Sequence, residues 1–431
     1  MQERKSVIIR PAKNILGSLR VPGDKSISHR YAMLAALASG QSKFDNFAPG
    51  ADCASTLRCV SAVGCKVERD EKGAVTVEGC GLELQAPTRP LDCGNSGSTM
   101  RMLSGILAAQ RFTSVLTGDA SLSRRPMKRV IEPLMQMGAH IKASEGDRAP
   151  LEIHGAKLHG INYRPAIASA QVKTSVLFAG LLADGKTAVE EPARTRDHGE
   201  LALRAFGVEV ERDRNTVGIQ GGQRLHALEA YVPGDISSAA FFLSAAAMFP
   251  ESNLVIDGVL LNPTRSALLD VLSAMGSRIS MVRVEESHGE LVGTIALVPG
   301  KGRHVLIEGS LTALLIDELP VLAAIAPYTV GGLEVRDAGE LRVKESDRLS
   351  AVTKNLQAMG AQVEETETGW RIPGGQRLHG AEFESYDDHR IAMAFTVAAL
   401  KAEGDSQIHN ADCVSISYPA FFEDLEKLVE R

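Results

Sequence analysis

Residues 21–30 read VPGDKSISHR and residues 232–241 read VPGDISSAAF, so the same Val-Pro-Gly-Asp opens two stretches of the chain. Both copies continue into small polar residues, and only the first copy carries a lysine and an arginine. The copies lie about 210 residues apart, close to half the length of the chain. This duplication predicts two related halves, each of which begins at one copy.

A shorter pattern recurs within the halves: a helix-like segment ends in glycine, and a β-branched strand follows. It occurs at Gly64, Gly138, Gly207, Gly276 and Gly360, at intervals of roughly 70 to 85 residues. We expect each glycine to end a helix in the left-handed region and the strand after it to form a hairpin. The chain therefore divides into six units of about 72 residues, three in each half.

Another helical segment precedes each of these helices, opening on Ser, Thr, Asp or Gly and continuing as Ala, Leu, Met and Phe. These segments are residues 23–38, 94–109, 169–183, 234–248, 316–326 and 387–400. Because they are apolar on all sides, we expect helices buried inside a domain. The sixth unit lacks its hairpin, and the strand-like residues 6–21 are expected to complete it. The predicted fold class is α/β, with one domain of residues 1–20 and 233–431 and a second of residues 21–232.

The composition is that of an ordinary globular protein, with 44% hydrophobic and 23% charged residues. A formal net charge of -6 argues against a general nucleic-acid binder. No apolar run reaches the length of about 20 residues that spans a bilayer, and the charged N-terminus lacks a signal-peptide core, so a cytoplasmic location is expected. The six cysteines contain no CxxC pair, which predicts neither a zinc site nor a disulfide framework.

The starts of the buried helices leave free backbone N–H groups at the positive ends of the helix dipoles, where anions bind. Each basic residue near these starts could, taken singly, be a solvated surface charge, but together they suggest an anion-binding cleft. They are Lys25, Arg30, Arg101, Arg124, Arg125, Lys173, Arg196, Lys344, Arg348 and Arg390. The interleaved acids are Asp317, Glu318, Glu345, Asp347, Asp387 and Asp388.

Glu345 lies one helical turn before Arg348, so it is either a structural ion-pair partner or an acid held near a substrate. The chain has no GxxxxGK[ST] loop, no zinc-ligand spacing and no GxSxG elbow, which leaves nucleotide hydrolysis and serine acyl transfer without support. The residues therefore predict a metal-free acid–base enzyme that handles anions.

Nine motifs between residues 21 and 418 resemble, in order, those of the 5-enolpyruvylshikimate-3-phosphate synthase family. They are GDKSISHR, GNSGSTMRML, GDASLSRRPMKR, ASAQVKTS, TRDH, VPGDISSAAF, LIDELP, LRVKESDRL and DDHRIAMA. The resemblance implies a two-domain inside-out α/β barrel in which each domain has three βαβαββ units. It also implies transfer of the enolpyruvyl group of phosphoenolpyruvate to the 5-hydroxyl of shikimate 3-phosphate through a tetrahedral intermediate, in aromatic amino acid biosynthesis. The site would lie in the cleft between the domains of a monomer that uses no cofactor or metal.

The same resemblance implies roles for individual residues. Asp317 would take the proton of the 5-hydroxyl, Glu345 would protonate C3 of phosphoenolpyruvate, and Lys25 is a further candidate for proton transfer. The residues implied to hold shikimate 3-phosphate are Lys25, Ser26, Arg30, Ser169, Ala170, Gln171, Arg196, Asp317 and Lys344. Those implied to hold phosphoenolpyruvate are Lys25, Asn95, Gly97, Arg125, Gln171, Lys344, Arg348 and Arg390.

Two departures and two alternatives accompany this resemblance. Some family members carry a lysine before a final aromatic-Pro pair, where this chain reads SISYP at residues 415–419. TRDH and LRVKESDRL are more similar to the branch that includes glyphosate-tolerant members, whereas Gly97 is the small residue associated with sensitivity, so the resemblance leaves both responses to this inhibitor open. A UDP-N-acetylglucosamine enolpyruvyl transferase would share the fold and the donor, but its loop cysteine is replaced here by Ala120. An inactive anion-binding scaffold would be expected to lose titratable groups, yet Lys25, Asp317 and Glu345 are present.

Overall fold

The computed structural model describes residues 5–431, which divide into two compact units. The central unit consists of residues 23–232 with residues 288–290, and the terminal unit consists of residues up to 22, 233–287 and 291–431. The chain thus passes from one unit to the other inside each copy of Val-Pro-Gly-Asp.

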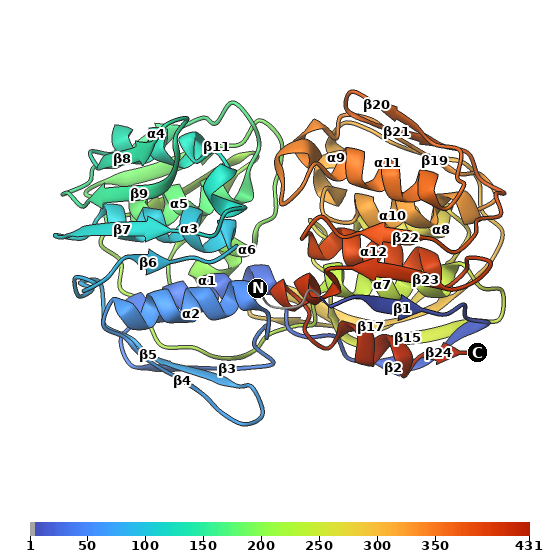
Figure 1. Ribbon diagram of the computed structural model, residues 1–431. Helices are drawn as coiled ribbons and strands as arrows, with labels where there is room; N and C mark the ends of the chain where they lie inside the picture. Colours follow the sequence, from blue (N-terminus) through green and yellow to red (C-terminus); the bar gives the residue numbers. More distant parts are fainter. Residues whose placement is uncertain (1–4) are drawn as a thin grey trace. The chain divides into compact units, whose positions relative to one another are not determined.

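The central unit repeats one βαβαββ arrangement, in which a helix joins two parallel strands and a second helix leads to an antiparallel hairpin (Figure 1). One repeat consists of β6 (Leu91–Asp92), α3 (Gly97–Ala108), β7 (Thr113–Thr117), α4 (Lys128–Gln136), β8 (His140–Ser144) and β9 (Arg148–His154). The next consists of β10 (Asn162–Tyr163), α5 (Ala170–Leu181), β11 (Lys186–Glu190), α6 (His198–Ala205), β12 (Val210–Asp213) and β13 (Thr216–Gln220). A further repeat consists of α1 (Lys25–Leu37), β3 (Gln41–Asp45), α2 (Ala51–Ala62), β4 (Lys66–Arg69) and β5 (Val75–Glu78), with β14 (Glu229–Tyr231) as its first strand.

The terminal unit follows the same plan. One repeat consists of β2 (Asn14–Leu19), α7 (Ile236–Ala247), β15 (Asn253–Leu260), α8 (Ala267–Ala274), β16 (Arg278–Ser287) and β17 (Glu290–Val298), and β24 (Val429–Glu430) pairs with β2. The next consists of β18 (Val305–Ile307), α9 (Ser310–Leu315), α10 (Leu319–Ile325), β19 (Leu333–Val335), α11 (Arg348–Ala358), β20 (Glu364–Thr366) and β21 (Gly369–Ile372). The last consists of β22 (Glu382–Glu384), α12 (His389–Ala399), β23 (Ser406–His409) and α13 (Phe421–Glu426), with β1 (Val7–Ile9) antiparallel to β23.

The Val-Pro-Gly-Asp copies mark an exchange of strands. β2 directly precedes α1 in the chain yet pairs with β15, and β14 directly precedes α7 yet pairs with β3. Each glycine faces the valine of the other copy: a Cβ on Gly23 would lie 3.0 Å from Val232 Cγ1, and one on Gly234 would lie 2.9 Å from Val21 Cγ2. The exchanged backbones pass so closely that only glycine fits.

The aspartate of each copy caps the helix that follows. Asp24 accepts a hydrogen bond from the backbone N–H of Ile27 at 2.9 Å, and Asp235 accepts one from Ser237 at 2.8 Å. Such caps satisfy backbone donors that have no partner within the helix. The motif therefore combines a close crossing of two chain segments with the start of a buried helix.

The helices predicted from the repeat are confirmed. The five glycines have φ angles of +104°, +110°, +88°, +120° and +83° in chain order, after α2, α4, α6, α8 and α11. The buried character of the first helices is also confirmed, since every residue of α12 is buried and so is every residue of α7 before Ala247. The N-terminal segment was predicted to complete the last repeat; β1 does so, but β2 joins the sheet of β15 instead.

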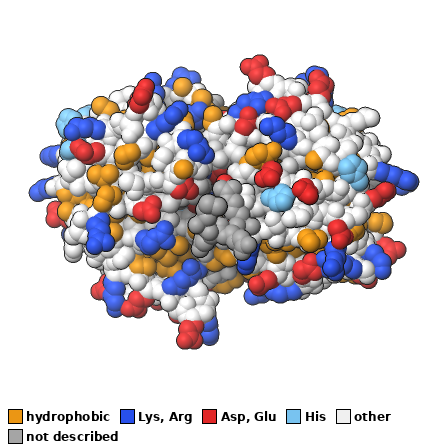
Figure 2. All heavy atoms as spheres, in the orientation of Figure 1, with side chains coloured by type: hydrophobic (Ala, Val, Ile, Leu, Met, Phe, Trp, Pro, Cys, Tyr) orange, Lys and Arg blue, Asp and Glu red, His pale blue; other side chains and the backbone are white. Residues whose placement is uncertain are grey.

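Acidic and basic side chains are interspersed over the face of the molecule drawn in Figure 2. Within residues 5–431 the cysteines form no disulfide, and Cys53, Cys59, Cys65 and Cys93 are buried. Within residues 5–431, none of the helices is long and apolar enough to cross a membrane.

Candidate active site

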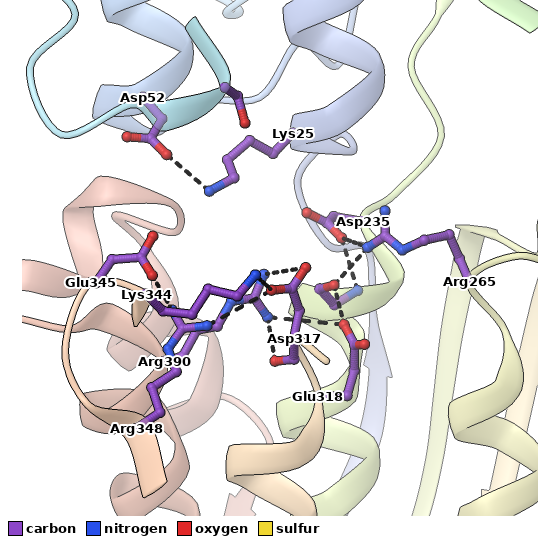
Figure 3. Close-up of polar contacts among 12 residues, drawn as sticks. Lys25, Asp52, Asp235, Arg265, Asp317, Glu318, Lys344, Glu345, Arg348 and Arg390 are labelled. Carbon is purple, nitrogen blue, oxygen red and sulfur yellow. Dashed lines mark hydrogen bonds and ion pairs between the residues drawn. The ribbon is translucent and has the colours of Figure 1, made fainter. Parts of the chain in front are cut away.

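In the terminal unit, the predicted proton acceptor Asp317 lies in the turn between α9 and α10, where three cations approach it (Figure 3). Lys344 Nζ lies 3.9 Å from Oδ1, and Arg348 Nη1 lies 3.8 Å from the same oxygen. Arg390 Nη2 lies 4.0 Å from Oδ2, and Nη1 of that arginine donates to the main-chain oxygen of Asp317 at 2.8 Å. Two other sequence motifs, LRVKESDRL and DDHRIAMA, thus supply the cations around this carboxylate.

Two of these cations occupy the first turns of helices. Asp347 caps α11, which begins at Arg348, by accepting from Ser350 N at 3.1 Å; Asp388 caps α12 by accepting from Arg390 N at 2.9 Å. A cation at a helix N-terminus is opposed by the helix dipole unless anions compensate it. The neighbouring carboxylates provide part of that compensation, and a bound anion would add to it.

Arg348 is held by a buried ion-pair network. Its side chain is 1% exposed, and it donates from Nε to Asp388 Oδ2 at 2.7 Å and from Nη2 to Glu345 Oε2 at 2.7 Å. Burial opposes the charge of Arg348, but Asp388 and Glu345 outweigh it and raise the pKa of the guanidinium above its ordinary value. Burial likewise opposes ionisation of Asp388, yet the charge of Arg348 holds the pKa of that carboxyl below its ordinary value. Glu345 therefore forms the structural ion pair with Arg348, which was one of the two roles considered for it. Its other role, as proton donor, stays a prediction.

Glu318, one of the predicted acids, belongs to a buried layer beside Asp317 whose other members, Ser237 and Arg265, were not predicted. Glu318 is 1% exposed, accepts a hydrogen bond from Ser237 Oγ, and lies 3.9 Å through Oε1 from Arg390 Nη1. Arg265, which is 2% exposed, donates to Ser237 Oγ at 2.6 Å (Figure 3). The second Val-Pro-Gly-Asp copy could have pointed to Ser237, but no sequence signal marked Arg265.

In the central unit, Lys25 is the first residue of α1 and donates from Nζ to Asp52 Oδ2 at 2.9 Å (Figure 3). Its side chain is 19% exposed, so part of it stays accessible to solvent. Arg30 is 3% exposed and donates to the main-chain oxygen of Ser26 at 2.8 Å and to Thr174 Oγ1 at 3.0 Å. Lys25, Ser26 and Arg30 thus share the first turns of one helix, and the role of Asp52 was missed.

The start of α3 gathers several predicted residues. Arg125 donates to Asn95 Oδ1 at 2.8 Å, and Arg101 donates to Gln171 Oε1 at 2.8 Å. A Cβ on Gly97 would lie 2.9 Å from Arg101 Nη1 and 3.4 Å from Arg125 Nη1. Gly97 therefore leaves room beside two guanidinium groups, and Arg101, to which no role was assigned, belongs to the same cluster.

The remaining predicted residues lie at the next two helix starts of the central unit. Ser169 caps α5 by accepting from Val172 N at 3.4 Å, and Ala170 is the first residue of that helix. Arg196 is half-buried in the segment that leads into α6.

The inclusion of Lys173 in the anion-binding cluster is wrong. Its side chain is 1% exposed, and Nζ lies 3.0 Å from Glu191 Oε1 and 2.6 Å from Glu200 Oε1. A buried ammonium between two carboxylates has its charge balanced by the protein itself. Lys173 therefore ties α5 to β11 and α6 as a structural residue.

Comparison with known proteins agrees with this arrangement. A model of the family EPSP synthase (3-phosphoshikimate 1-carboxyvinyltransferase) matches residues 9–425. The 3-phosphoshikimate 1-carboxyvinyltransferase of Koribacter versatilis (strain Ellin345) is 62% identical over 427 residues, which cover 99% of this chain and 100% of that protein. The protein of the same name from Solibacter usitatus (strain Ellin6076) is 53% identical over 423 residues, covering 98% of this chain and 99% of the relative.

Solved structures give the same result. The EPSP synthase from Acinetobacter baumannii superposes with a TM-score of 0.87 at 40% sequence identity, covering 98% of each chain. The resemblance, the two-domain inside-out α/β fold and the transferase class predicted from the sequence are confirmed. The chain belongs to the EPSP synthase (3-phosphoshikimate 1-carboxyvinyltransferase) family.

Proposed function

We propose that this chain transfers the enolpyruvyl group of phosphoenolpyruvate to the 5-hydroxyl of shikimate 3-phosphate and releases phosphate, in the pathway to aromatic amino acids. The observation that carries the proposal is the family match over residues 9–425, joined with the position of Asp317 among Lys344, Arg348 and Arg390. Both substrates carry a carboxylate and a phosphate, which lysine and arginine bind through charge-assisted hydrogen bonds.

In the addition step, the 5-hydroxyl oxygen bonds to C2 of phosphoenolpyruvate while C3 gains a proton. Asp317 accepts the hydroxyl proton and Glu345 donates the proton to C3, so the tetrahedral intermediate carries a phosphate and a methyl group. Lys25 is the second candidate for a proton-transfer role. Positioned acids and bases of this kind contribute about 10²–10⁴-fold each to a rate.

In the elimination step, the bond between C2 and the phosphate oxygen breaks, C3 loses a proton, and the double bond forms again. Glu345, now a carboxylate, accepts the C3 proton, and Asp317 gives its proton to the departing phosphate, which leaves as hydrogen phosphate. The same two carboxyl groups thus act in both directions, and the enzyme regains its starting protonation state.

The residues that the resemblance implies bind the substrates belong to both units, and we propose that the two units close on the substrates and exclude water. The sets implied by the resemblance keep their assignments, with Lys25, Gln171 and Lys344 shared between the two substrates. We also propose that the enzyme acts in the cytoplasm as a monomer, without cofactor or nucleic-acid partner; a net charge of -6 and two small anionic substrates support the last point.

The test is phosphate release from both substrates without added metal, with mass spectrometry of the organic product. Release should require both substrates, and Glu345→Gln should lose about 10²–10⁴-fold in kcat while binding shikimate 3-phosphate within about twofold of the native protein. The matched control is Glu308→Gln, because Glu308 is 52% exposed in a surface ion pair with Arg336.

Two results would overturn the proposal. Phosphate release with UDP-N-acetylglucosamine in place of shikimate 3-phosphate would reassign the chain to the other enolpyruvyl transferase. Tight binding of shikimate 3-phosphate with no phosphate release from either acceptor would indicate an inactive scaffold.

A further inference from the structure

A chain of buried hydroxyl groups begins at His29 in the central unit. His29 Nδ1 lies 2.7 Å from Thr56 Oγ1, which lies 2.6 Å from Thr99 Oγ1, and Thr99 Oγ1 donates to Ser96 Oγ at 2.7 Å. All four side chains are fully buried. Neither the motif comparison nor the catalytic cycle gives these groups a role.

The direction of each hydrogen bond follows from counting protons. A threonine hydroxyl has one proton to donate, and that of Thr99 goes to Ser96, so Thr56 must donate to Thr99. The proton of Thr56 is then used, so His29 must donate to it from Nδ1. Each hydrogen bond of this series is therefore donated in the same direction, from the imidazole of His29 toward Ser96.

The environment of His29 is consistent with a neutral ring whose one proton sits on Nδ1. Nε2 is buried and has no hydrogen-bond partner among the residues that the structure describes. Burial, and then the charges of Lys25 and Arg30, lowers the pKa of His29 well below its ordinary value. The ring is thus a fixed donor rather than a group that titrates near neutral pH.

Through Thr56 on α2, these hydrogen bonds connect the starts of α1 and α3, which both carry predicted substrate contacts. His29 lies one turn after Lys25 on α1, and Thr56 lies one turn after Asp52 on α2. Ser96 is the N-cap of α3, with its Oγ accepting from Thr99 N at 3.1 Å, and it stands between Asn95 and Gly97. Removing a hydroxyl from the middle of this series would break the side-chain link from α1 and α2 to the start of α3.

We propose that His29 is a positioning residue, which donates from Nδ1 into the chain through Thr56 and Thr99 and so holds Asn95 and Gly97 where they contact phosphoenolpyruvate. This proposal rests on the proposed function, since it assigns His29 to the site for that substrate. His29 does not touch the substrate; it acts through the cap of α3.

The first experiment measures which ring nitrogen of His29 carries the proton. Nitrogen-15 NMR of the native protein should show a neutral buried histidine with its proton on Nδ1 whose signal vanishes in His29→Asn, while the signal of His198, which donates from Nδ1 to Glu290 Oε1 at 2.6 Å, remains. A proton on Nε2, or a ring that titrates between pH 6 and 7, would overturn the proposal without any measurement of activity.

The second experiment compares kinetics of phosphate release in three variants. His29→Leu and Thr56→Val should each raise the KM for phosphoenolpyruvate about tenfold or more, with the affinity for shikimate 3-phosphate within about threefold of native. His29→Asn should return the KM to within about threefold, because its amide N–H can occupy the place of Nδ1–H. The double variant should be no worse than either single one, because both break the same chain.

The control is Thr396→Val, which removes an equally buried hydroxyl that, within residues 5–431, donates only to Ala392 O of its own helix, at 2.8 Å. Equal kinetics for Thr56→Val and Thr396→Val would overturn the positioning role, and so would a His29→Asn protein as impaired as His29→Leu. Absence of turnover in the native protein would instead refute the proposed function, which separates the two failures.

Discussion

Replacing Asp388 with asparagine should destabilise the terminal unit strongly, because it leaves the buried charge of Arg348 partly uncompensated. Asp388 accepts from Arg348 Nε at 2.7 Å and from Nη2 at 3.2 Å, and both side chains are at most 1% exposed. Removing one partner of such a pair costs about 3–5 kcal/mol. Asparagine keeps one oxygen acceptor and Glu345 stays in place, so we expect the lower end, about 3 kcal/mol.

The assay is urea unfolding followed by tryptophan fluorescence. Trp370 is the one tryptophan of the chain, is fully buried in the terminal unit, and donates to Leu349 O at 3.1 Å, next to Arg348 on α11. With a slope of about 2–3 kcal/mol per molar urea, the midpoint should fall by about 1–1.5 M. The control is Glu308→Gln, whose surface ion pair contributes at most about 1 kcal/mol. A midpoint for Asp388→Asn no lower than that of the control would refute the reasoning.

The same pair predicts a dependence on pH with a definite sign. Since the folded state holds the pKa of Asp388 below its ordinary value, the carboxylate stabilises the fold above the unfolded pKa of about 4. That contribution is lost as the pH falls through the folded value. The difference in unfolding free energy between the native protein and Asp388→Asn should therefore stay constant from about pH 5 to 7 and narrow below about pH 4; a difference that grows on acidification would contradict this.

Two substitutions of glycine test close approaches in the central unit. Gly97→Ala would place Cβ 2.9 Å from Arg101 Nη1, so the KM for phosphoenolpyruvate should rise about tenfold in steady-state kinetics. Calorimetry should find the affinity for shikimate 3-phosphate within about twofold of the native value. An unchanged KM would show that the guanidinium group moves aside without cost. Gly23→Ala would overlap the carbonyl oxygen of Asn46, a backbone atom that cannot rotate aside, so we expect a loss of about 3 kcal/mol or more and a clear fall in melting temperature. Gly339→Ala is the control, because its added Cβ would lie 3.6 Å from the nearest atom, and its melting temperature should equal that of the native protein. A melting temperature of Gly23→Ala equal to that of this control would contradict the close approach of the backbones at Gly23.

The repeat was predictable because its signals are local. A glycine that ends a helix needs a left-handed conformation at that one position, and Gly64 and Gly276 indeed have φ of +104° and +120°. The strand exchange was not predictable in the same way. β2 pairs with β15 although residues 23–232 of the central unit lie between these two strands in the sequence. The alternation of residues within a strand does not indicate which distant strand it pairs with.

The candidate site shows the same division. Short motifs marked Asp317, Lys344 and Arg348, since each motif has an unusual charge at a helix start. Side-chain partners from distant elements decided the rest: Asp52 for Lys25 was missed, and Lys173 was misread because its two glutamates lie on other elements. A charge in the sequence does not show whether its counter-ion is a ligand or another residue.

The most direct test of enolpyruvyl transfer by addition and elimination is the reaction of the native protein in heavy water, with mass spectrometry of the product. Because Glu345 exchanges its proton with solvent before it protonates C3, the transient methyl group should gain deuterium and leave part of it in the enolpyruvyl methylene of the product. A product free of deuterium at every extent of reaction would contradict protonation of C3, and with it the mechanism proposed for this site.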